Sequence, residues 1–227
     1  MLTIASRCWL CQQPLQLAKH GICSLCIRHL PELPCCCPRC GLPSGNTRLP
    51  CGRCILRPPL WQSLIFASVY QLPISTLLLR FKFSSTPELA EPLARLLLLQ
   101  WLARWRTGSV ARPEVLLSIP LHLRRYRHRG YNQSELLARP LARWLGCDYQ
   151  PYALERHRAT VPQQRLSEPK RKLNLRQAFT CNSSLTGKHV ALIDDVVTTG
   201  STISEVSKLL NKKDIASLQI WCICRTL

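Results

Sequence analysis

From residue 60 onward, short apolar runs alternate with longer amphipathic stretches, and this pattern predicts alternating strands and helices. Mainly apolar runs of strand length occur at 63–70, 115–120, 189–193 and 215–224. Apolar positions with helical spacing occur at 87–105, 132–146 and 202–211. Such alternation favours an α/β fold in which helices cross over a parallel sheet.

The predicted helix at 132–146 carries three more specific expectations. Asn132 stands at its start and is of a residue type that caps helix N-termini. Trp144 falls on the apolar face with several leucines, so we expect it to point inward. Pro140 lies inside the helix, where it cannot donate the usual backbone hydrogen bond, and it predicts a kink.

The segment 1–58 differs in composition and predicts a small cysteine-rich module. Ten of the fourteen cysteines lie between Cys8 and Cys54, in a stretch without long apolar runs. Such a segment is too short to build an ordinary hydrophobic core. Pro58 and Pro59 suit a stiff linker. We therefore divide the chain into a double zinc-ribbon module at 1–58 and an α/β domain at 59–227, each expected to have its own core.

Four C-x-x-C pairs indicate two metal sites. Two residues between cysteines let a tight turn aim both sulfurs at one ion, and two such turns complete a four-thiolate zinc shell. Disulfides or an iron–sulfur cluster are the alternatives, and spacing leaves open whether consecutive or interleaved pairs share an ion. Shells made entirely of sulfur are closed, so these zinc ions would be structural. The predicted ligands are Cys8, Cys11, Cys23, Cys26, Cys37, Cys40, Cys51 and Cys54.

The segment 190–202 predicts a phosphate-binding turn. Four apolar residues lead into Asp194 and Asp195, which then lie at the carboxyl end of a strand, where open parallel sheets bind ligands. The next residues form a turn into a helix N-terminus, where free amides and the helix dipole favour an anion. An acidic strand end followed by an ordinary helix cap is the simpler alternative. The predicted binding residues after the aspartates are Val196, Val197, Thr198, Thr199, Gly200, Ser201 and Thr202.

Charge narrows the choice of partners. The formal net charge is +19, which favours a partner rich in phosphate. The sequence does not open with a basic segment followed by an apolar run, as a secretory signal does, so we expect a cytoplasmic protein. The most apolar stretch, 89–105, is too short and too charged for a membrane span.

Much of this charge lies between residues 121 and 176, where 13 Arg and Lys against four Asp and Glu leave +9 (13 − 4). Arginine binds diphosphate groups through forked donors, and Arg129 is the predicted contact. The region could instead follow the phosphates of single-stranded DNA, with Tyr126, Tyr131 and Trp144 stacking on bases.

Several strings together resemble known families. VALIDDVVTTGST at 190–202 resembles the phosphoribosyl diphosphate (PRPP) motif of type I phosphoribosyltransferases. With IPLHLRRYRHRGYNQSELLA from Ile119, FKF at 81–83 and the cysteine pairs, the chain resembles the ComF family of competence and DNA-utilization proteins, most closely its enterobacterial GntX (YhgH) branch. A further spaced motif of this resemblance consists of Thr160, Gln163, Leu166, Arg171, Asn174, Ala178 and Phe179.

The resemblance implies a type I phosphoribosyltransferase-like sheet with flanking helices, with the ribose 2′ and 3′ hydroxyls on Asp194 and Asp195 and Mg²⁺ on the sugar and diphosphate. It also implies a role in using imported DNA, with DNA-uptake proteins as partners. Two alternatives stay open: an active phosphoribosyltransferase whose base or amine acceptor the sequence does not identify, and a basic accessory factor that binds single-stranded DNA.

Overall fold

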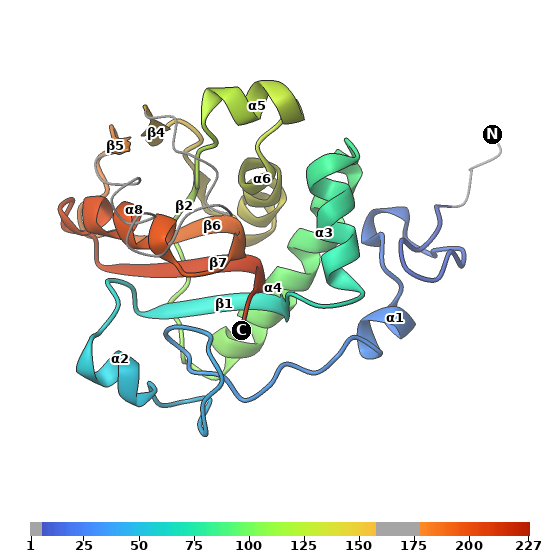
Figure 1. Cartoon of the computed structure of the whole chain (residues 1–227), viewed down its shortest axis with the longest axis horizontal. Coiled ribbons are helices and arrows are strands. Elements are labelled where there is room, and N and C mark those ends of the chain that lie inside the picture. The colour runs from blue at the N-terminus through green and yellow to red at the C-terminus, as the bar shows by residue number, and fades with distance from the viewer. Residues whose placement is uncertain (1–5, 158–177) are drawn as a thin grey trace.

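A five-stranded parallel sheet forms the centre of the protein, whose computed structural model describes residues 6–157 and 178–227 (Figure 1). The strand order is β1-β7-β6-β2-β3. A separate antiparallel pair, β4 and β5, lies beside it. The strands are β1 (Ser63–Val69), β2 (Val115–Ser118), β3 (Asp148–Tyr149), β4 (Leu154–Arg156), β5 (Phe179–Cys181), β6 (His189–Val197) and β7 (Ser217–Arg225).

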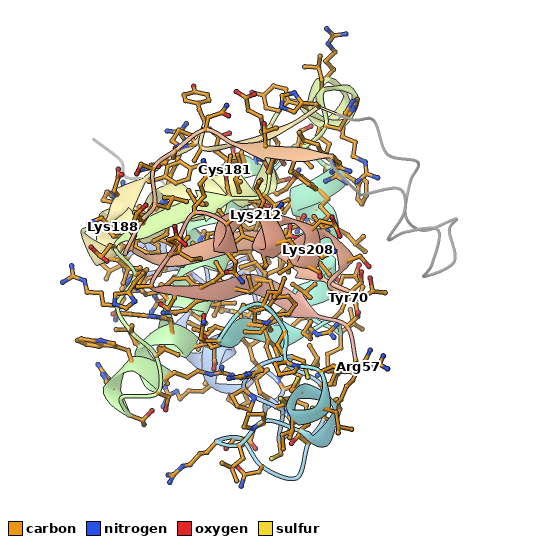
Figure 2. All side chains as sticks on the ribbon, turned by 90° about the vertical axis from the view of Figure 1, so that its left-hand side faces the viewer. Arg57, Tyr70, Cys181, Lys188, Lys208 and Lys212 are labelled. Carbon is orange, nitrogen blue, oxygen red and sulfur yellow. The ribbon has the colours of Figure 1, made fainter. Side chains whose placement is uncertain are left out.

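Helices cover both faces of the sheet, because alternate residues of each strand point to opposite sides. One face packs on α3, α4 and α6, and the other packs on α8 and on the β4–β5 pair. In Figure 2, α8 lies in front of the sheet beside the label of Lys208, with Cys181 of β5 above it and Arg57 below it. The helices are η1 (Ala18–His20), α1 (Ser24–Arg28), α2 (Gly52–Leu56), α3 (Ile74–Phe83), η2 (Pro87–Leu89), α4 (Ala90–Arg106), α5 (Leu123–Arg129), α6 (Gln133–Leu145) and α8 (Ser201–Asn211).

The predicted α/β architecture is confirmed, and the element boundaries shift by a few residues. The largest shift is in β6, which continues through both aspartates to Val197 because β7 pairs with it along that length. Helix α6 is capped by the Asn132 side chain, which accepts from the Ser134 N–H, and it contains Pro140. Trp144 was wrongly expected to point inward: it is 39% exposed and lies beside the Arg143 guanidinium.

The described part of the cysteine-rich segment, residues 6–58, has no core of its own, contrary to the sequence expectation. Cys8 and Ile22 belong to the cluster formed by α3, α4, α6 and one face of the sheet. Cys36 belongs to the cluster on the opposite face. The segment therefore wraps around the β1 edge and uses the sheet as its hydrophobic support. The Leu64 N–H on β1 donates to the Pro38 carbonyl over 2.9 Å, which satisfies part of an otherwise open strand edge.

Within the described residues, no helix combines the length and apolarity needed to cross a membrane.

Candidate functional site

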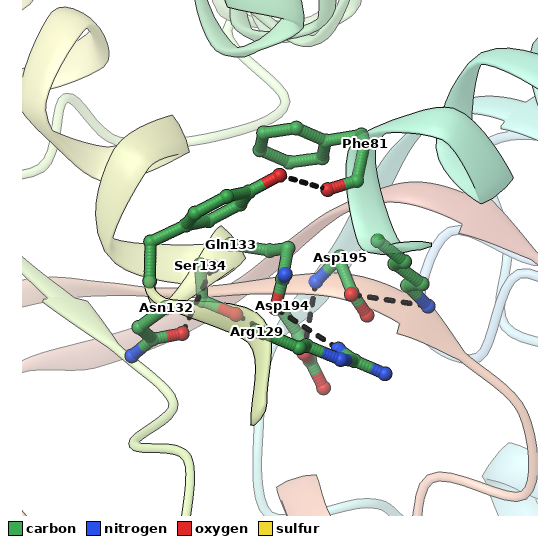
Figure 3. A network of polar contacts seen from close by, with 9 residues as sticks. Phe81, Arg129, Asn132, Gln133, Ser134, Asp194 and Asp195 are labelled. Carbon is green, nitrogen blue, oxygen red and sulfur yellow. Dashed lines mark hydrogen bonds and ion pairs between the residues drawn. The ribbon is translucent and has the colours of Figure 1, made fainter. Parts of the chain in front are cut away.

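Two aspartates at the carboxyl end of β6 form the centre of the candidate site (Figure 3). Ser134 Oγ donates to Asp194 Oδ1 over 3.3 Å, and the Asp195 N–H donates to the same oxygen over 2.8 Å. Lys82 Nζ on α3 lies 3.0 Å from Asp195 Oδ2. The helices that follow β2 and β6 lie on opposite faces of the sheet, and open sheets bind ligands where such connections diverge.

Asp194 titrates close to neutral pH. Burial, followed by the negative charge of Asp195, raises the pKa of Asp194 from 3.8 to about 7. The Asp195 N–H, the Lys82 ammonium and the Ser134 hydroxyl favour the carboxylate, but they do not offset its burial. Hydroxyl groups of a ligand that donate to Asp194, or a cation beside it, would therefore stabilise its ionised form.

Arg129 ends α5 and lies close to these aspartates. Its Nη1 donates to Gln133 Oε1 over 3.0 Å, and its guanidinium carbon lies 5.1 Å from the centroid of the Phe83 ring. Burial lowers the pKa of Arg129, whereas the charge of Asp195 opposes this change. Gln133 is 1% exposed, and its Nε2 has no hydrogen-bond partner among the described residues. Arg129, Lys82 and Gln133 thus supply cations and an amide donor next to two carboxylates.

The turn between β6 and α8 has the geometry of an anion site. Gly200 is the residue before α8 and has φ 75°, a left-handed conformation that glycine adopts without steric cost. Helix α8 begins directly after this glycine, and the positive end of its dipole favours an anion at that position. Val196 and Val197 pack against the two hydrophobic clusters and offer a ligand only their main chain. Thr198 and Thr199 are exposed to solvent, and Thr199 Oγ1 lies 2.8 Å from Ser201 Oγ at the start of α8.

Sequence reasoning found part of this site. The structure brings Asp194, Asp195 and Arg129 together, as a shared ligand would require. It also adds Lys82, whose signal in the sequence was its place between two phenylalanines near the end of α3. Gln133 lies in the string that starts at Ile119, but the sequence alone assigned it no role. The spaced motif that starts at Thr160 lies mostly outside the described residues, which include only its Ala178 and Phe179.

Tyr131 has a different role from the base stacking considered for it. Its hydroxyl donates to the Phe81 carbonyl, and the two ring centroids are 5.8 Å apart. Tyr131 therefore ties the start of α6 to α3, the helix that carries Lys82. Tyr126 on α5 is 45% exposed, so it keeps a surface on which a base could stack.

The eight paired cysteines form two tetrads from consecutive pairs, which decides a question that spacing left open. The first tetrad is Cys8, Cys11, Cys23 and Cys26, and the second is Cys37, Cys40, Cys51 and Cys54. Within each tetrad the sulfurs lie within 4.8 Å of one another. The Cys11–Cys23 and Cys40–Cys51 sulfur distances are both 3.8 Å. A tetrahedral ion with bonds of about 2.3 Å to sulfur places its ligands about 3.8 Å apart, so the tetrads fit a single metal ion such as zinc.

Backbone amides prepare both tetrads for metal binding. The Cys23 N–H donates to Cys8 Sγ over 3.4 Å, and the Cys51 N–H donates to Cys37 Sγ over 3.3 Å. Burial disfavours the thiolates, but backbone N–H groups outweigh it and lower the pKa of Cys8 to about 6 and that of Cys37 to about 7. Thiolate is the form that binds metal, so at neutral pH Cys8 is mostly in this form and Cys37 is partly in it.

Comparison with known proteins agrees with this geometry. The model of the phosphoribosyl transferase domain family matches residues 132–227. The chain is 47% identical over 227 residues to DNA utilization protein YhgH of Salmonella typhi, covering 100% of both chains. It is 37% identical over 223 residues to competence protein F of Haemophilus influenzae, covering 96% of both.

Among solved structures, the chain is similar to a purine phosphoribosyltransferase from Pyrococcus horikoshii, with 15% identity and a TM-score of 0.36 over 63% of this chain and 75% of that chain. At that score the structural likeness adds no argument. The identity and coverage of the two sequence relatives are decisive: the chain belongs to the ComF family of competence and DNA-utilization proteins.

Proposed function

We propose that this protein binds PRPP with Mg²⁺ at the carboxyl end of β6 and that it serves, in the cytoplasm, in the use of imported DNA. One observation carries the proposal. Asp194 and Asp195 lie close to Arg129, and the turn with Gly200 follows them along the chain. Phosphate, sugar and diphosphate each require a different kind of partner. The turn supplies amides, the aspartates supply acceptors, and Lys82 and Arg129 supply cations.

Each group of the ligand has an assigned partner. Asp194 and Asp195 accept hydrogen bonds from the ribose 2′ and 3′ hydroxyls, and Arg129 binds the diphosphate. Mg²⁺, when bound, supplies positive charge between the sugar and the diphosphate. The 5-phosphate binds the amides and hydroxyls of the turn, which consists of Val196, Val197, Thr198, Thr199, Gly200, Ser201 and Thr202.

Both cysteine tetrads hold zinc in this proposal, and both ions are structural. The support is the four-sulfur shell of each tetrad, which leaves no open position for a substrate. A single ion fits better than an iron–sulfur cluster, because several irons would hold the thiolates further apart than one ion does.

Phosphoribosyl transfer is a second candidate function of the same site. Lys82 and Arg129 favour it, since cations beside a leaving diphosphate stabilise the charge that develops as its bond to ribose C1 breaks. The acceptor would be a base or an amine. The DNA role also has a local candidate: α5 presents the exposed Arg127 and Tyr126, which suit the phosphates and bases of single-stranded DNA.

Calorimetric titration of the full chain tests the binding proposal directly. PRPP with Mg²⁺ should bind more tightly than ribose 5-phosphate, because only PRPP engages Arg129. The double variant Asp194→Asn, Asp195→Asn should lose most of that affinity. Glu114→Gln, which changes an exposed carboxylate paired with Lys188 just before β2, is the matched control. Equal affinity of the parent and the double variant would contradict the ribose assignment. Diphosphate release with a panel of nucleobases and amines then separates binding from transfer.

A further inference from the structure

The second cysteine tetrad contacts the phosphate turn through two side chains from different parts of the chain. The first is Trp61, whose Nε1 donates over 2.7 Å to the carbonyl of Arg39, between Cys37 and Cys40. Its ring also lies beside the turn, because a Cβ added at Gly200 would be 3.9 Å from Trp61 Cη2. Trp61 thus donates to the C-x-x-C turn of Cys37 and Cys40, which we call the knuckle, and lies beside the glycine of the phosphate turn.

The second is Arg225 at the end of β7, which is only 6% exposed. Its Nε donates to the Cys40 carbonyl over 3.0 Å, and its Nη1 donates to the Val197 carbonyl over 3.1 Å and to the Thr198 carbonyl. A guanidinium holds its donors in a fixed plane, so fixing one end of it orients the other. Arg225 therefore couples the position of the knuckle to the positions of Val197 and Thr198, which precede Gly200 in the turn.

Charge adds to this coupling. Among the described residues, the Arg225 guanidinium donates to carbonyl oxygens, and none of these contacts places a carboxylate beside its positive charge. Burial lowers the pKa of Arg225, and the negative charges of Cys222 and then of Cys40 oppose this change. Four thiolates with one divalent ion carry a net charge of −2, so a loaded tetrad acts on Arg225 in the same direction as Cys40. A loaded second tetrad thus stabilises the buried guanidinium that supports the turn.

The first tetrad has no such link among the described residues. Its neighbour Ile22 packs into the cluster on the opposite face of the sheet, where the carbonyl of Ile22 accepts from Arg95 Nη1 on α4 over 3.3 Å. Arg95 is thus a matched counterpart of Arg225: an arginine that donates to the main chain of a cysteine knuckle, but without contact to the turn.

We propose that the second tetrad positions the phosphate turn through Arg225 and Trp61, so that metal at this tetrad and a phosphate ligand at the turn stabilise each other. The identity of that ligand rests on the proposed function, whereas the mechanical coupling does not. Reciprocity follows from linkage: whatever metal does for ligand affinity, ligand does for metal affinity.

Hydrogen–deuterium exchange of the ligand-free full chain tests the mechanical part. Arg225→Lys keeps the charge but cannot reach the same carbonyls together, so peptides covering 196–204 should exchange at least about threefold faster. Arg95→Lys should leave these peptides unchanged, and both variants should keep the parent metal content. Trp61→Phe, which removes only the ring N–H donor and one ring, gives the same readout if Arg225→Lys does not fold. Unchanged exchange at 196–204 in the folded variants would overturn the proposal.

Metal release tests the reciprocal part. With Mg²⁺ in excess, saturating PRPP should slow the transfer of one of the two zinc ions to a zinc-selective chelator by roughly tenfold, and Arg225→Lys should abolish the effect. Equal protection of both ions, or protection that survives in Arg225→Lys, would refute the assignment to the second tetrad. If the parent does not bind PRPP at all, the proposed function fails, and the exchange experiment still decides the coupling.

Discussion

Replacing Asp194 with Asn tests the electrostatics of the candidate site without any ligand. Asn has nearly the same shape, and its oxygen can still accept from the Ser134 hydroxyl and the Asp195 N–H. What the substitution removes is a carboxyl group whose pKa is raised to about 7, first by burial and then by Asp195. Above that pH the parent must keep a charge in this position, whereas the variant does not.

The sign and size of the effect follow from linkage. Because the pKa is higher in the folded than in the unfolded chain, the protonated carboxyl stabilises the fold fully below about pH 4, and this stabilisation is lost as the pH rises to about 7. For values of 3.8 and about 7, the cost to the parent relative to a neutral side chain is about 2 kcal/mol at pH 5 and about 4 kcal/mol at pH 8. Part of Asp194 still contacts solvent, so these figures are upper limits.

Urea unfolding of the parent and of Asp194→Asn at pH 5 and pH 8 measures this cost. The variant should gain stability relative to the parent by up to about 2 kcal/mol between the two pH values. Metal loss at low pH affects both proteins alike and cancels in the difference, which metal analysis at each pH can verify. A stability difference that does not change with pH, or one that falls as pH rises, would refute the assignment of a near-neutral pKa to Asp194.

Three further outcomes are expected. Metal analysis of protein purified without chelator should find close to two zinc ions per chain, and a value near one, or mostly iron, would contradict the interpretation of the tetrads. Asp194→Asn with Asp195→Asn should weaken PRPP binding at least about tenfold, as one lost charge-assisted hydrogen bond alone would, while circular dichroism shows the fold intact. Single-stranded DNA affinity should fall with salt by a logarithmic slope of roughly −0.7 per phosphate contact, and Arg125→Ala with Arg127→Ala should flatten that slope. No measurable DNA binding at about 50 mM salt would argue against a direct DNA contact.

Local pattern was enough for the architecture and for the main members of two candidate sites. Apolar runs placed β1, β2, β6 and β7 within a few residues, because buried parallel strands are continuous in sequence. The cysteine spacing singled out the eight members of the two tetrads, because a turn of only four residues brings the two sulfurs of each pair together. The positions of Asp194, Asp195 and Gly200 at a strand end and in a turn could also be predicted, because the strand end, the turn and the helix start follow one another along the chain.

Only the tertiary structure decided what depends on contacts between distant segments. Lys82 reaches Asp195, and Arg225 reaches the Cys40 carbonyl, because the parallel sheet brings the ends of β1, β6 and β7 to one edge. The pairing of the tetrads and their division between the two faces of the sheet were settled in the same way. No local sequence pattern encodes these contacts, because each depends on the apolar surface against which a distant segment packs. Residues 6–58 of the cysteine-rich segment, those that the structure describes, lack a core of their own, so their place was decided by the sheet on which they pack.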